Sequence, residues 1–130
     1  MPEQRDAAAQ YSPLSCENEI RLFLLYPGSD GDVVTGRMEC LELGSVCKLF
    51  EALSYVWDGT DDGATILVDD ISVSVTKSLE AALRHLRFQD RPRILWIDYI
   101  CINRYDIEER NRQVAKMGLI YEFAVAVLIG

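Results

Sequence analysis

The chain has 130 residues, and its content of 49% hydrophobic and 26% charged residues excludes an intrinsically disordered chain. Its 21 aspartates and glutamates outnumber its 13 lysines and arginines. The resulting net charge of −8 argues against nucleic acid or an anionic membrane surface as a partner.

The N-terminal part of the chain divides into two predicted segments. Residues 1–15 are polar and contain Ala, Ser and Pro, which predicts a flexible lead-in. No basic region followed by an apolar one occurs there, so we expect no secretory signal, a cytoplasmic protein and reduced cysteines. Residues 16–51 are predicted to form an N-terminal β extension. In this segment, residues 20–26 are a strand-like apolar run, and residues 37–43 are expected to pair as an antiparallel edge strand.

The first elements of the predicted core, residues 52–130, are β-rich. Residues 52–57 (ALSYVW) are apolar on both alternating faces, which is typical of a strand covered on both sides. Residues 65–68 and 71–75 flank the pair Asp69-Asp70, and this arrangement predicts a small hairpin.

A helix is predicted directly after the hairpin. Thr76 or Ser78 can cap its first turn, because a hydroxyl oxygen can accept a hydrogen bond from a backbone N–H at the helix start. Leu79, Leu83 and Leu86 then form an apolar stripe at helical spacing.

The C-terminal part repeats the alternation of strand and helix. Residues 93–98 (RILWID) predict a strand buried on both faces, followed by a loop that contains Cys101. Asp106 begins a long helical pattern, and residues 125–129 predict a buried last strand. Strands that alternate with helices predict an α/β fold with a mainly parallel sheet and flanking helices. The apolar run at residues 123–129 is far too short for a membrane span.

A candidate ligand site follows from this topology. In open parallel sheets, ligands bind beyond the carboxyl ends of the strands. Carboxylates, an amide and arginines follow two of the predicted strands, and such a group can perform acid–base chemistry or hold a polar ligand. The candidate residues are Asp58, Asp98, Asn103, Arg104, Glu109 and Arg110. One histidine and scattered cysteines provide no metal site, and no phosphate-binding glycine motif occurs.

Structural explanations compete with these functional ones. Asp106 and Glu109 have capping-box spacing, so Glu109 is as well explained by capping as by catalysis. Cys101 is predicted to be a buried, inert thiol, because no second histidine is present to activate it.

Four motifs occur in a characteristic order: EALSYVW, VTKSLEAALRHLR, LWIDYICIN and EERNRQVAKMGLIYEFAVAVLIG. Together they resemble the heterokaryon-incompatibility (HET) domain of filamentous fungi, over residues 20–130. The chain departs from the family pattern in three places, of which the first is Ser78-Leu79 in the position of the family's Asn-Leu at the helix start. In the other two, Asp58-Gly59 reverses the Gly-Asp that follows the tryptophan in the family, and Arg104 replaces the glutamine of Cys-Ile-Asn-Gln.

The resemblance implies a role in nonself recognition and programmed cell death signalling. HET domains usually lie at the N-terminus of larger proteins, so we expect the chain to continue beyond Gly130. The family's fold is thought similar to TIR domains, which are flavodoxin-like signalling modules. The resemblance implies assembly with itself or with partner signalling domains and requires no cofactor. The alternative is a TIR-like enzyme with NAD as its substrate, in which Glu109 is the catalytic carboxylate.

Overall fold

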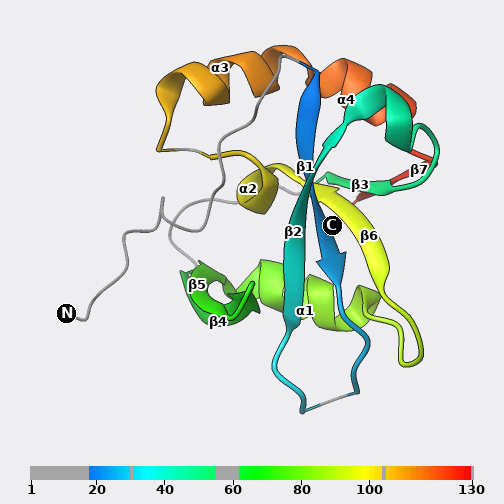
Figure 1. The fold of residues 1–130 in the computed structure, drawn as a ribbon. Helices are drawn as coiled ribbons and strands as arrows, with labels where there is room; N and C mark the ends of the chain where they lie inside the picture. The colour runs from blue at the N-terminus through cyan, green and yellow to red at the C-terminus, as the bar shows by residue number, and fades with distance from the viewer. Residues whose placement is uncertain (1–17, 30, 55–61, 104, 130) are drawn as a thin grey trace.

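A seven-stranded mixed sheet organises the molecule (Figure 1). The computed structural model describes residues 18–29, 31–54, 62–103 and 105–129. The strands are β1 (Glu19–Leu25), β2 (Thr35–Glu42), β3 (Glu51–Ser54), β4 (Asp62–Val68), β5 (Ile71–Thr76), β6 (Arg93–Ile97) and β7 (Ala126–Ile129). The helices are the 3-10 helix η2 (Leu43–Val46) and the α-helices α1 (Lys77–Leu86), α2 (Asp98–Cys101), α3 (Ile107–Ala115) and α4 (Met117–Phe123).

The strand order is β5-β4-β2-β1-β6-β3-β7, and the pairing is mixed. β3 pairs in parallel with both β6 and β7, as the alternation of strands and helices predicts. β2 and β4 are also parallel, but β1 is antiparallel to both of its neighbours, and β4 and β5 form an antiparallel hairpin. The prediction of a mainly parallel sheet is therefore wrong. The reason is that the N-terminal strand β1 joins the sheet beside β6 and continues it with antiparallel pairs.

β2 is not the edge strand that we predicted. It pairs antiparallel with β1 over residues 36–42, and its first two residues pair with β4 on the other side. Gly36 is required at this position, because a Cβ atom there would collide with the backbone carbonyl oxygen of Leu24 in β1 and would lie 2.6 Å from the ring of Phe23. A residue without a side chain is required where the two backbones approach so closely.

The hairpin and the helix after it confirm the local predictions. Asp69 and Asp70 have φ angles of 52° and 66°, the left-handed pair that a two-residue hairpin turn of the I′ type requires. The Thr76 hydroxyl caps α1 by accepting a hydrogen bond from the Leu79 backbone N–H at 3.0 Å. Leu79 and Leu83 are fully buried, so the apolar stripe faces the core.

The core has its centre on β1 and β6. Alternate and adjacent apolar side chains of both strands are completely buried, because the sheet is covered on both faces at this point. These residues are Ile20, Leu22, Phe23 and Leu25 of β1 and Leu95, Trp96 and Ile97 of β6. In Figure 1, α3 and α4 lie together at the top of the view and α1 lies at the bottom.

The C-terminal third differs from the prediction in three places. The expected loop around Cys101 is the short helix α2. The long helix predicted from Asp106 is divided at Lys116 into α3 and α4. β7 is an edge strand rather than a buried one, and its Val127 side chain is 46% exposed. Among the described residues, the helices are all too short to form a membrane span.

Candidate functional site

The structure brings only some of the predicted site residues together. Asp58 and Arg104 lie outside the described residues. Asp98 is the first residue of α2, directly after β6, and the backbone N–H of Asn103 donates to Glu109 Oε2 at 2.9 Å. The side chain of Arg110 is exposed. The structure thus brings Asn103 and Glu109 together beside the carboxyl end of β6.

Glu109 forms a buried, two-pronged ion pair with Arg21 of β1. Arg21 Nη1 lies 2.5 Å from Oε2 of Glu109, and Nη2 lies 2.8 Å from Oε1. The two side chains are only 1% and 5% exposed. Arg21 Nη1 also donates to the backbone carbonyl oxygen of Cys101 at 3.2 Å. One guanidinium therefore joins β1, the end of α2 and the first turn of α3.

Sequence reasoning did not find Arg21. Arg21 is the one charged residue in the apolar run of residues 20–26. Its position in a strand predicted to be buried could have indicated a buried ion pair. A charged side chain in a strand buried on both faces needs a buried partner of opposite charge, because an unpaired charge there would strongly destabilise the fold. The signal predicts that a partner exists, but it does not identify Glu109.

The capping box around α3 is only half formed. Asp106 Oδ1 accepts a hydrogen bond from the Glu109 backbone N–H at 3.2 Å, as predicted. The carboxylate of Glu109 does not return the bond, and the backbone N–H of Asp106 instead donates to the Asn103 carbonyl at 3.2 Å. Completing the box is therefore the wrong structural explanation of Glu109, since its side chain is held by Arg21 and Asn103.

A second contact holds α3 against β1. The side chain of Gln113 is buried, and its Nε2 donates to the backbone carbonyl of Glu19 at 3.2 Å. The buried residues of α3 are Glu109 and Gln113, so this helix faces the sheet with polar side chains. The polar pair fixes both the position of α3 and its rotation about its own axis.

Polar side chains also gather where the neighbouring parallel strands β3 and β6 end. Ser54 is the last residue of β3, and Asp98 follows β6. The pKa of Tyr121 in α4 is raised, first by burial and then by the negative charge of Asp98, while a hydrogen bond with the Ser54 side chain lowers it. These three oxygen-bearing groups are at the place where open sheets bind ligands.

Trp96 borders this group. Its ring meets the ring of Tyr121 edge to face, with centroids 5.8 Å apart. The indole Nε1 is buried and has no hydrogen-bond partner among the residues that the structure describes.

Cys101 is the buried thiol that we predicted. Burial raises its pKa to about 12, and the backbone N–H of Ile97 donates to its sulfur at 3.4 Å. A neutral, enclosed thiol cannot act as a nucleophile near neutral pH. In the described part of the chain, His, Cys, Asp and Glu form no group of three or more that could hold a metal ion.

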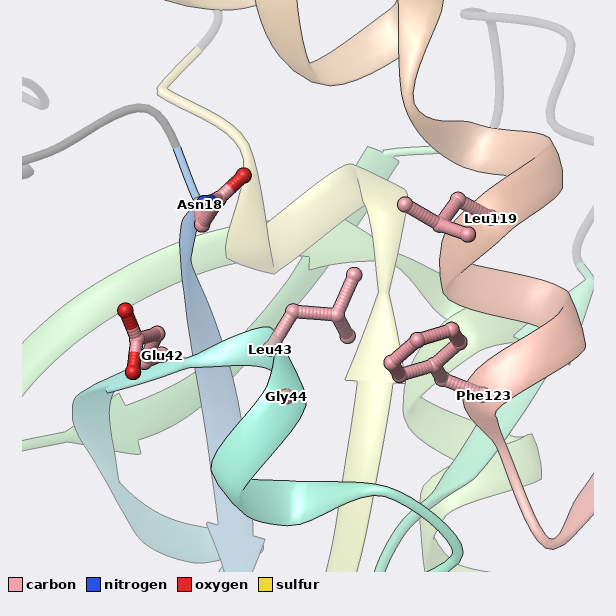
Figure 2. A pocket seen from close by; sticks show the side chains of 6 residues that line it. All are labelled: Asn18, Glu42, Leu43, Gly44, Leu119 and Phe123. Carbon is pink, nitrogen blue, oxygen red and sulfur yellow. The ribbon is translucent and has the colours of Figure 1, made fainter.

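A pocket of about 310 Å³ lies between η2 and α4 (Figure 2). Leu43, Leu119 and Phe123 point toward one another on its apolar side, and Asn18 and Glu42 lie on the other side. None of the predicted site residues lines this pocket. The residues that line the pocket therefore do not include the polar groups at the ends of β3 and β6.

Comparisons with known proteins agree on one family. Residues 50–130 match the family model described as heterokaryon incompatibility protein (HET). The "Heterokaryon incompatibility protein 6, OR allele" of Neurospora crassa is 40% identical over 91 residues. This match covers 60% of the present chain and 13% of the relative, so the chain spans only a small part of that relative's length. No solved structure matches the chain.

Proposed function

Since the chain belongs to the heterokaryon incompatibility (HET) family, we propose that it acts in fungal nonself recognition and signals programmed cell death by assembling with itself or with partner domains. We expect this signalling to take place in the cytoplasm. The family match over residues 50–130 is the observation that carries the proposal.

The environment of Glu109 favours assembly over catalysis. Both carboxylate oxygens already accept hydrogen bonds, from Arg21 and from the Asn103 backbone N–H, and the side chain is almost fully buried. A catalytic carboxylate must reach the reacting atoms of its substrate. Here a substrate would first have to displace Arg21, so a structural role for Glu109 fits a signalling module better.

Forced clustering tests the proposal. The chain is fused to a module that dimerises when a small molecule is added, and the fusion is expressed in fungal cells. We expect cell viability to fall only when the dimeriser is present, and the dimerising module without the chain is the control. Unchanged viability after clustering would contradict a death-signalling role.

A second candidate function is hydrolysis of NAD by a TIR-like domain. The gathering of Ser54, Asp98 and Tyr121 at the carboxyl ends of β3 and β6 supports it. In this proposal Glu109 stabilises positive charge that develops on the ribose, and other polar groups at this edge bind the substrate. The proposed binding residues are Asp58, Asp98, Asn103, Arg104 and Arg110.

Asp98→Asn separates this candidate from the first. Glu109→Gln is a poor test by itself, because it leaves the charge of Arg21 buried without its carboxylate. Asp98→Asn preserves side-chain shape, and the exposed Asp90→Asn is a matched control. The clustered chain is expected to consume NAD, and Asp98→Asn is expected to abolish turnover without changing thermal unfolding. An unmutated, clustered chain that leaves NAD intact rules the enzyme out.

A further inference from the structure

The pocket between η2 and α4 has the size and the lining of a small-molecule site. Its volume of about 310 Å³ falls at the lower end of the range, roughly 300–1,000 Å³, that ligand pockets in proteins have. Such pockets are mainly apolar and contain a few polar groups. In Figure 2, Leu43, Leu119 and Phe123 converge on one side of the hollow, and Asn18 and Glu42 lie on the other. The pocket therefore has an apolar wall and a polar wall.

Hydrogen bonds hold both walls of the pocket in place. The backbone N–H of Leu43 donates to the Asn18 carbonyl oxygen at 2.8 Å, which joins the start of η2 to the residue before β1. The backbone N–H of Lys48, in the turn after η2, donates to the Phe123 carbonyl oxygen at 2.7 Å. The Lys48 ammonium donates to two more carbonyl oxygens at the end of α4, at 2.8 and 3.2 Å. Neither wall can move into the hollow without breaking such bonds, so the pocket is preformed.

The Glu42 carboxylate determines which ligand charge the pocket accepts. Glu42 is exposed, and it forms no ion pair with the residues that the structure describes. A carboxylate forms its strongest hydrogen bonds with donors that carry a positive charge. The net charge of −8 also attracts a cation and repels an anion. On the apolar wall, Leu119 is still 43% exposed, so a hydrocarbon group can bury further surface there.

We propose that this pocket binds a small organic amine, with its protonated nitrogen beside Glu42 and Asn18 and its hydrocarbon body against the apolar wall. A primary ammonium has three donors, so it can bond the Glu42 carboxylate and the side-chain oxygen of Asn18 together. An anion of the same shape lacks these bonds, and a cation without a hydrocarbon body gains nothing from the apolar wall. The pocket shares no residue with the candidate site, so the inference does not rest on the proposed function.

Titration of the full chain with phenethylamine tests the pocket, with the backbone amide resonances as the readout. We expect saturable shifts of the resonances of Leu43, Gly44 and Leu119, which line the pocket. 3-Phenylpropionate has a similar hydrocarbon body and the opposite charge, and methylammonium has the same charge without the hydrocarbon body. Each of these two compounds should bind about tenfold more weakly than phenethylamine, or weaker still.

Two matched pairs of variants separate the pocket from general charge and surface effects. Glu42→Gln should raise the dissociation constant of phenethylamine by about fivefold. Glu122→Gln removes an equal charge from an exposed position of α4 outside the lining and should leave the constant unchanged. Leu119→Ala should raise it by about threefold, because less hydrocarbon surface is buried. Leu49→Ala is its control, since Leu49 is 61% exposed and does not line the pocket.

Several results would overturn the proposal. Phenethylamine would shift no resonance of the pocket, or 3-phenylpropionate would bind as tightly as phenethylamine. Equal weakening by Glu42→Gln and Glu122→Gln would assign the binding to net charge, and equal effects of Leu119→Ala and Leu49→Ala would remove the apolar wall from the site. Thermal unfolding checks that all four variants are folded, which we expect because each replaced side chain is at least partly exposed.

Discussion

Arg21 and Glu109 are the residues on which the candidate site depends. They are 88 positions apart in the sequence and form a two-pronged pair that is nearly closed to solvent. Each charge is tolerated in the core only because the other is present. Glu109 also accepts a hydrogen bond from the backbone N–H of Asn103, so the pair is connected to the end of α2 as well as to α3.

Removing one member of this pair should be severe. We expect Arg21→Met to lower the free energy of unfolding by about 3–5 kcal/mol, because it leaves the Glu109 carboxylate buried and unpaired. Arg37→Met should lower it by about 1 kcal/mol or less, since the pair of Arg37 with Glu39 is exposed. Urea unfolding measures both values. Equal losses in the two variants would show that the buried pair does not support the fold.

A double-mutant cycle measures the interaction energy between Arg21 and Glu109. Arg21→Met combined with Glu109→Met should cost less than the sum of the two single changes, because no unpaired charge remains in the core. Strict additivity would mean that the two side chains do not interact energetically.

The buried Cys101 thiol should make the protein less stable as the pH rises into the alkaline range. The ordinary pKa is 9.0, and burial raises it to about 12 in the folded protein. Between these values the unfolded chain binds fewer protons than the folded one, so the free energy of unfolding falls as the pH rises. The slope from this group is at most about 1.4 kcal/mol per pH unit, and its contribution is fully present below pH 9.0.

Cys101→Ala checks this dependence. Urea midpoints should decline more slowly with pH in the variant than in the parent chain, although the variant is less stable overall. Some decline remains, because burial also raises the pKa values of Cys40 and Tyr121. Identical pH profiles would contradict the assignment of the effect to Cys101.

At the scale of elements, the β4–β5 hairpin has a turn whose residues are not the preferred ones. Asp69 and Asp70 both adopt left-handed φ angles, which glycine tolerates best. The Asp69 carboxylate accepts a hydrogen bond from the Met38 backbone N–H at 3.4 Å. Asp69 thus connects the hairpin turn to β2. Asp70 is exposed and is the better position for a substitution.

Asp70→Gly should stabilise the protein. We expect a gain of about 0.5–1 kcal/mol in the free energy of unfolding, because the left-handed backbone is then free of Cβ strain. Asp70→Ala removes the same negative charge but keeps the strain, so it should give no gain. Thermal unfolding of the two variants separates backbone strain from charge, and equal midpoints would assign the effect to charge alone.

For the whole molecule, the decisive feature is that β1 lies inside the sheet. It pairs with β2 on one side and with β6 on the other, although it precedes residues 50–130, which match the family model. Four of its five large apolar side chains, Ile20, Leu22, Phe23 and Leu25, are almost completely buried. At roughly 1.5–3 kcal/mol each, they contribute roughly 6–12 kcal/mol to folding.

A fragment of residues 50–130 should therefore not fold by itself. The contribution of β1 is comparable to the whole net stability of a typical domain, about 5–15 kcal/mol. We expect the fragment to lack a cooperative thermal transition and dispersed amide resonances, both of which the full chain should show. A cooperatively folded fragment would mean that β1 is an accessory strand.

Local sequence patterns predicted a secondary-structure element correctly where the interactions that form it are between neighbouring residues. Alternation in residues 93–97 and the Thr76 cap depend on neighbours within a few positions, so the sequence reports them directly. The break of the last helix at Lys116 and the short helix α2 were not predicted, because side-chain periodicity continues through both places. Of the candidate site, proximity of Asn103 and Glu109 was expected, whereas their link to Arg21 was not.

The sequence by itself determined the HET family, the type of most elements, the β4–β5 hairpin and the inert thiol, since each depends on short motifs or on backbone preferences. Only the tertiary structure decided the central antiparallel place of β1, the pairing of Arg21 with Glu109 and the rotation that leaves Ile107 and Val114 exposed. These features arise from contacts between residues far apart in the chain. Their free energy comes from burying strand faces and pairing charges, which local sequence patterns do not reveal.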